Sequence, residues 1–132
     1  MSTRGSLGLV VSFVAFVAIA LPLDRSSTVA QQFTLSLLAW AFLGTALVFQ
    51  PPAIRVQVVV LVVLATILEC VGSLIWGAYT YRLENLPLYV PAGHGLFYLS
   101  ALRAASLPLL QRQARALVVA VTAGATAWML YG

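Results

Sequence analysis

The sequence predicts an all-α protein, a polytopic bundle of five transmembrane helices. Of its 132 residues, 62% are hydrophobic and only 8% are charged, whereas a typical soluble domain is about 45–50% apolar and about 25% charged. A chain of this size has too much surface for so few charges to cover. The mean hydropathy of +1.02 agrees. Together these values exclude a soluble monomer and a disordered chain, and a single cysteine, Cys70, excludes a disulfide-stapled module.

Five apolar stretches approach the length of about 20 residues that crosses roughly 30 Å of hydrocarbon. The first contains no charge and ends at the polar residues 24–28, and the second ends at two adjacent prolines, which cannot continue a helix. The third opens with a run of valines and leucines and contains Glu69. With no internal repeat and no long linker, the chain is expected to form one integral membrane domain over 1–132, with spans at 7–23, 33–49, 56–78, 86–110 and 116–131.

Two of these spans have a second interpretation. Arg4, an apolar stretch and Ala18-Ile19-Ala20 also resemble a signal peptide with its cleavage site, although the apolar run continues past that site. Cleavage there, or after Ala30, would leave four spans in the same orientation. The last span is short and the sequence stops directly after it. This fits either a natural end or a chain whose relatives continue with further helices.

The basic residues orient the bundle. All seven are arginines, and cytoplasmic loops of membrane proteins carry the excess of positive charge. Assigning alternate loops to two sides places five arginines on one side and two on the other, which predicts a cytoplasmic N-terminus and an outside C-terminus in a bacterial inner (plasma) membrane. The net charge of +4 is therefore expected from the loops and does not indicate nucleic-acid binding. The five are Arg4, Arg55, Arg103, Arg112 and Arg115; the two are Arg25 and Arg82.

Small residues recur at four-residue spacing in the last span, at Ala116, Ala120 and Gly124. Such a ridge allows close approach of another helix. It predicts packing within the bundle or, alternatively, a contact in a homo- or hetero-oligomer.

Glu69 and His94 are the residues that the lipid environment does not explain. An ionisable side chain at bilayer depth costs about 2.5–3.5 kcal/mol on insertion scales and usually has a partner or a task. At 1.5 Å per residue, Glu69 lies roughly 13 Å and His94 roughly 10–12 Å below the outer ends of their spans. Because the two spans are consecutive and antiparallel, the side chains are expected to meet in the outer half of the membrane. They form either an interhelical polar clamp or an acid/base pair that shares a proton.

Several neighbours are candidate partners of this pair. Tyr98 follows His94 by one helical turn and is a candidate third catalytic residue. Proline and glycine next to His94 release backbone groups and let a ligand approach, so a break in the helix there would mark a cavity. The candidate substrate-binding residues are Gly72 and Trp76 on the Glu69 face, Tyr79, Tyr81 and Arg82 in the capping loop, and Pro91, Gly93 and Gly95 around His94.

The sequence indicates no cofactor and no metal. One histidine and one well-placed glutamate fall short of the three protein ligands usual at catalytic zinc. Phosphate-binding loops, nucleophile elbows, Cys-x-x-Cys and haem motifs do not occur in it.

The stretch from Glu69 to His94, ECVGSLIWGAYTYRLENLPLYVPAGH, resembles a segment of the carotenoid hydratase family of carotenoid-biosynthesis membrane proteins. The matching positions are an intramembrane glutamate, two glycines, a Gly-x-Tyr-x-Tyr element and two prolines: Glu69, Gly72, Gly77, Tyr79, Tyr81, Pro87 and Pro91. Where that family tends to have a tryptophan after the second proline, this chain has Gly93-His94-Gly95. The resemblance implies addition of water to an isoprenoid double bond.

Three functions are consistent with the sequence. The first is a membrane enzyme that acts on a lipid or isoprenoid with Glu69 and His94 as acid and base. The second is a non-catalytic assembly or accessory subunit that binds its partner through Ala120 and Gly124. The third is a small transporter in which Glu69 and His94 relay protons.

Overall fold

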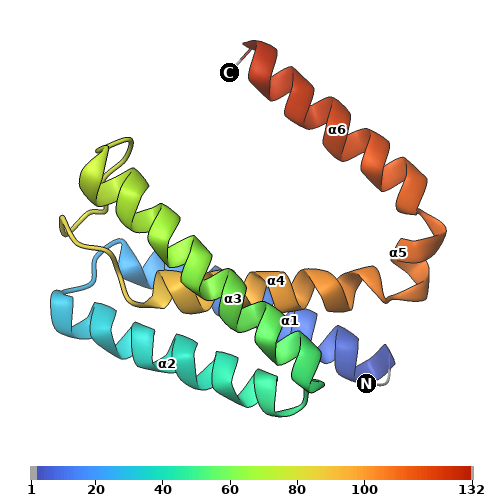
Figure 1. Ribbon diagram of the computed structural model, residues 1–132, viewed down its shortest axis with the longest axis horizontal. Helices are drawn as coiled ribbons and strands as arrows, with labels where there is room; N and C mark the ends of the chain where they lie inside the picture. Colours follow the sequence, from blue (N-terminus) through green and yellow to red (C-terminus); the bar gives the residue numbers. More distant parts are fainter. Residues whose placement is uncertain (1–2, 132) are drawn as a thin grey trace.

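The computed structural model describes residues 3–131, and this part of the chain is all-helical (Figure 1). Four helices, α1 (Thr3–Asp24), α2 (Val29–Val48), α3 (Pro52–Glu69) and α4 (Tyr89–Ala105), make the bundle. A π-helical turn, η1 (Cys70–Ile75), continues α3. A short helix, α5 (Pro108–Arg112), leads to the final helix, α6 (Ala114–Tyr131). The predicted all-α class is therefore confirmed.

Four helical segments are long and apolar enough to cross a membrane: α1, α2, α6 and the continuous α3–η1 segment Pro52–Ile75. The fourth expected span, 86–110, is shorter than predicted. Its helix begins at Tyr89 and ends after 17 residues at Ala105. Leu107 precedes Pro108 and is extended, with φ −75° and ψ 129°, because the proline ring disfavours a helical residue before it. The chain therefore turns at 106–107 and starts α5 afresh.

Local sequence signals account for the starts of α2 and α3. The hydroxyl of Thr28 accepts a hydrogen bond from the Gln31 backbone, and the Gln31 side chain accepts one from the Thr28 backbone, at 2.8 Å. This capping box starts α2. Pro52 occupies the first turn of α3, where its missing N–H has no cost.

Helix α4 lies at the centre of the bundle and packs against α1, α2 and α3 (Figure 1). Ala92, Leu96 and Leu99 of α4 are fully buried, together with Ala39 of α2 and Val58 of α3. Gly95 makes the closest approach. A Cβ atom there would lie 2.8 Å from Val62 and 3.0 Å from Leu43, so only glycine fits this three-helix contact without a shift in its neighbours.

Polar contacts tie the loops together at each end of the bundle. At one end, a terminal Arg82 nitrogen donates to the Ser27 carbonyl and, at 3.1 Å, to its hydroxyl. At the other end, Arg103 donates to the Gln50 side chain, and Arg55 donates to the Gln50 carbonyl at 2.8 Å. The alternate loops expected on one side of a membrane therefore share one end of the bundle.

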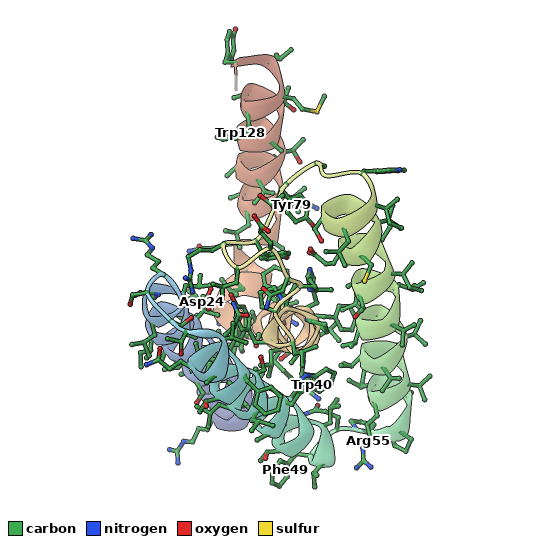
Figure 2. All side chains as sticks on the ribbon, turned by 90° about the vertical axis from the view of Figure 1, so that its left-hand side faces the viewer. Asp24, Trp40, Phe49, Arg55, Tyr79 and Trp128 are labelled. Carbon is green, nitrogen blue, oxygen red and sulfur yellow. The ribbon has the colours of Figure 1, made fainter. Side chains whose placement is uncertain are left out.

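Helix α6 turns away from the bundle (Figures 1 and 2). None of its residues is buried, whereas each of the other candidate spans has buried residues. The ridge of Ala116, Ala120 and Gly124 therefore does not pack against the other helices.

Candidate functional site

Glu69 is the last residue of α3, at the point where the helix widens into the π-helical turn. Single π-helical turns occur frequently at functional sites. The Ser73 hydroxyl donates to the Glu69 carbonyl at 2.6 Å, which satisfies a backbone group inside the turn. Gly72 lies beside the Tyr79 ring, and a Cβ atom there would be in ordinary van der Waals contact with it, at 3.4 Å. The loop that follows the widened turn brings two tyrosines to Glu69.

One carboxylate oxygen of Glu69 is held by two phenols. The Tyr79 and Tyr81 hydroxyls both donate to Glu69 Oε2, the latter at 2.7 Å. The two rings pack edge to face, with centroids 5.8 Å apart. Two donors to a single oxygen fix the orientation of the carboxylate.

The other oxygen, Oε1, faces His94 on α4, with Nε2 at 3.5 Å. His94 Nδ1 lies 2.9 Å from the Val90 carbonyl. Since a carbonyl only accepts, Nδ1 is assigned as the donor, and Nε2 is the nitrogen that faces the carboxylate. The contact is an ion pair only when the imidazole carries a proton on both nitrogens. The expected proximity of Glu69 and His94 is present in the structure.

The imidazole also borders an apolar cleft between α1 and α4. The cleft has a volume of about 400 Å³, within the usual range for small-molecule sites. The His94 side chain is 39% exposed, whereas that of Glu69 is only 16% exposed. The cleft is lined by Phe13, Phe16, Val17, Ala20, Leu21, Tyr89, Val90, Gly93, His94 and Phe97. Its wall is therefore apolar apart from the imidazole and a phenol.

The environment of the two loop tyrosines perturbs their titration. The hydrogen bond to Glu69 raises the pKa of Tyr79 above its ordinary value. Burial, and then the hydrogen bond to Glu69, raises the pKa of Tyr81 well above the usual range. Both phenols stay protonated at neutral pH and act as donors to the carboxylate.

The other predicted site residues are distributed around this centre. Tyr98 lies on the α4 face predicted for it, but its hydroxyl donates to Gln57 on α3 at 3.2 Å rather than to the pair. Trp76 is 77% exposed. Arg82 bonds to Ser27, which ties the capping loop to the α1–α2 turn.

The Pro91–Gly95 segment does not break the helix. Pro91 lies in the first turn of α4, where it is tolerated, and α4 is continuous through His94. Gly93 lines the cleft, and Gly95 makes the close helix contact. The irregular backbone is instead the loop over 76–88, where Gly77 has a φ of +61° and Glu84 a φ of +53°.

A second polar cluster, which the sequence analysis missed, lies at the same end of the bundle. Asp24 accepts hydrogen bonds from Tyr89 at 2.8 Å, Ser27 at 2.9 Å and Gln32 at 3.2 Å. Asn85 extends the cluster by donating to Gln32 at 2.9 Å. A signal was available, because Asp24 is one of only three acidic residues in the chain.

Within residues 3–131, no group of three His, Cys, Asp or Glu side chains is arranged to hold a metal ion. Comparison of the chain with protein-family models, with curated proteins and with solved structures finds no match. The geometry of Glu69, His94, Tyr79, Tyr81 and the cleft is thus the basis for assigning a function.

Proposed function

We propose that the chain is an integral membrane enzyme that carries out acid/base chemistry on a lipid or isoprenoid substrate. The observation that carries the proposal is the position of His94, which contacts Glu69 on one side and the apolar cleft on the other. A proton held between an imidazole and a carboxylate is available to a molecule in that cleft. A clamp that only joined two helices would not require an apolar cleft beside it.

The reaction class is protonation of a carbon–carbon double bond followed by addition of water, as the resemblance to carotenoid hydratases implies. The Glu69/His94 pair gives up one proton to an alkene carbon, and water adds to the cation formed at the other carbon. The added water then loses a proton to the Glu69/His94 pair, which restores the starting state. The sum is one alkene plus one water giving one alcohol, with no redox change.

The two tyrosines have a positioning role in this scheme. By donating to Oε2, Tyr79 and Tyr81 orient the Glu69 carboxylate and leave Oε1 for the imidazole. A charged partner stabilises the imidazolium that donates the proton. The arginine distribution supports a plasma-membrane protein with a cytoplasmic N-terminus, which places the site in the outer half of the bilayer.

Turnover by purified protein in lipid nanodiscs tests the proposal. Glu69→Gln and His94→Ala are expected to remain folded and to lose the conversion of prenyl substrates to products heavier by one water, measured by mass spectrometry. Glu84→Gln is the matched control, because it makes the same change at an exposed loop position. Conversion by either site variant at the wild-type rate would contradict the proposal.

A second candidate function is an accessory subunit without catalysis. It is favoured by the exposure of α6, which has no buried residue and no partner among the bundle helices. In that case, larger side chains at Ala120 and Gly124 are expected to cause loss of a partner protein rather than loss of turnover.

A further inference from the structure

The cleft beside His94 has a definite direction. On α1 it follows residues 13 to 21, or about 12 Å at the helical rise of 1.5 Å per residue. On α4 it is lined from Tyr89 to Phe97. Because α1 and α4 are antiparallel, the cleft runs along the bundle axis. Phe97 in its lining is 64% exposed, so the cleft opens laterally, toward lipid.

The two ends of the cleft differ chemically. Phe13 and Phe97 line its inner end, with their rings edge to face and their centroids 6.3 Å apart. Tyr89 lines its outer end, and the Tyr89 hydroxyl donates to Asp24 at 2.8 Å. Asp24 belongs to the second polar cluster, which also includes Arg82 through Ser27. One end is therefore aromatic, and the other is polar.

The geometry points to a single-chain alcohol as the ligand of this cleft, with its hydrocarbon chain along α1 and its hydroxyl among Tyr89 and Asp24. This inference rests on the proposed function, because the ligand would be the substrate that His94 meets. A hydroxyl both donates and accepts, so it suits an end of the cleft where the lining phenol, Tyr89, is hydrogen-bonded to the carboxylate of Asp24. A fatty-acid carboxylate would instead meet the charge of Asp24, and a cleft of about 400 Å³ between two helices favours one chain over two.

The same geometry sets which part of the ligand reacts. His94 lies five residues inward of Tyr89 on α4, which is about 7.5 Å along the helix. With the hydroxyl at Tyr89, the imidazole faces a carbon of the chain and not the polar head. The proposed reaction therefore takes place within the hydrocarbon chain of the ligand and not at its hydroxyl.

The single histidine of the chain makes ligand binding measurable without turnover. Diethyl pyrocarbonate modifies exposed imidazole, and the mass of the peptide that contains His94 reports the extent of modification. Farnesol, added to protein in phosphatidylcholine nanodiscs at ten times its dissociation constant, is expected to slow this modification about tenfold, because it leaves about one cleft in eleven empty. Palmitate at the same concentration is expected to protect much less.

Gly93→Leu is the variant for this test. A side chain at Gly93 meets no atom within 4 Å and would fill the cleft that Gly93 lines. Farnesol should then no longer change the rate of His94 modification. Gly44→Leu is the matched control, since Gly44 is equally open but lies on α2 outside this cleft, and it should keep the full effect of farnesol.

Four results would overturn the inference. The first is that farnesol does not protect His94 in the wild-type protein, and the second is that palmitate protects it equally. The third is that farnesol still protects His94 in Gly93→Leu. The fourth is that protection depends on protein concentration, which would assign the cleft to a second copy of the chain. The outcome is separable from that of the proposed function. Protection by farnesol without turnover would support the binding site and contradict the proposed enzyme function. Turnover without protection would support the enzyme function and contradict the binding site.

Discussion

At the residue scale, the two carboxylate oxygens of Glu69 have different partners. Oε2 accepts from two phenols, while Oε1 faces an imidazole. An ionisable group inside the bilayer needs such partners, because its insertion alone costs about 2.5–3.5 kcal/mol. The two kinds of partner have different roles. The phenols orient the carboxylate, and the imidazole lies between the carboxylate and the cleft.

The titration of the two loop tyrosines provides the first prediction. The hydrogen bond to Glu69 raises the pKa of Tyr79 above the ordinary 10.0, and burial together with the hydrogen bond to Glu69 raises that of Tyr81. Glu69→Gln removes the negative charge, so the tyrosinate absorbance of the variant should rise at lower pH than that of the wild-type protein. Spectrophotometric titration in nanodiscs measures this, with Glu84→Gln as the control of unchanged titration. Identical curves for Glu69→Gln and wild type would contradict the phenol–carboxylate contacts.

The sign of the associated stability follows from the direction of the pKa shifts. A pKa that is higher in the folded than in the unfolded state contributes stability that is fully present below the unfolded value of about 10. That stability is lost as the pH rises through the folded pKa. The stability contributed by the contacts of Tyr79 and Tyr81 with Glu69 should therefore be constant from neutral pH to about 10 and decrease above it.

At the element scale, the close contact of α4 with α2 and α3 depends on one glycine. Gly95→Ala places a Cβ atom 2.8 Å from Val62 and 3.0 Å from Leu43. Overpacking of this kind costs about 1–3 kcal/mol, and thermal unfolding in detergent should show the loss. Gly93→Ala is a matched control two residues away on the same helix, because its Cβ meets nothing within 4 Å. Equal destabilisation of both variants would refute the packing argument.

The loop over 76–88 depends on a different kind of contact. Arg82 donates to the carbonyl and hydroxyl of Ser27, across the gap between two loops. Hydrogen bonds to charged groups contribute about 1.5–3 kcal/mol, so Arg82→Ala should speed amide hydrogen exchange in this loop by about tenfold or more. Arg25→Ala removes the same charge from the neighbouring turn and should leave the loop unchanged. Unaltered exchange in Arg82→Ala would show that other contacts hold the loop.

Most helix positions, although not the length of the span expected at 86–110, and the meeting of Glu69 with His94 could be predicted from the sequence. Both follow from hydropathy and from the rise per residue of antiparallel helices. The partners of Glu69 could not. Tyr79 and Tyr81 reach it through a loop with positive φ at Gly77 and Glu84, and hydropathy periodicity does not encode such a path. The Asp24 cluster was missed for a related reason, since it joins polar residues from separate elements.

At the scale of the whole molecule, the chain divides into a bundle and a separate helix. The bundle of α1–α4 holds the cleft and both polar clusters, whereas α6 contributes no buried residue. Between lipid-exposed helices there is no hydrophobic driving force for packing, because lipid tails are as apolar as leucine. A solitary apolar helix is therefore stable in a bilayer, and small residues on it provide a surface for another helix.

Larger side chains on that surface distinguish packing within the bundle from a contact with another helix in an oligomer. Ala120→Leu with Gly124→Leu should leave the unfolding free energy of the bundle within about 0.5 kcal/mol of wild type, because both positions are exposed and a Cβ at Gly124 meets nothing within 4 Å. If the ridge contacts another helix in an oligomer, the same variant loses that partner in native mass spectrometry from mild detergent. A large loss of bundle stability would instead mean that α6 packs against its own bundle in the membrane, and the accessory-subunit function would lose its supporting observation.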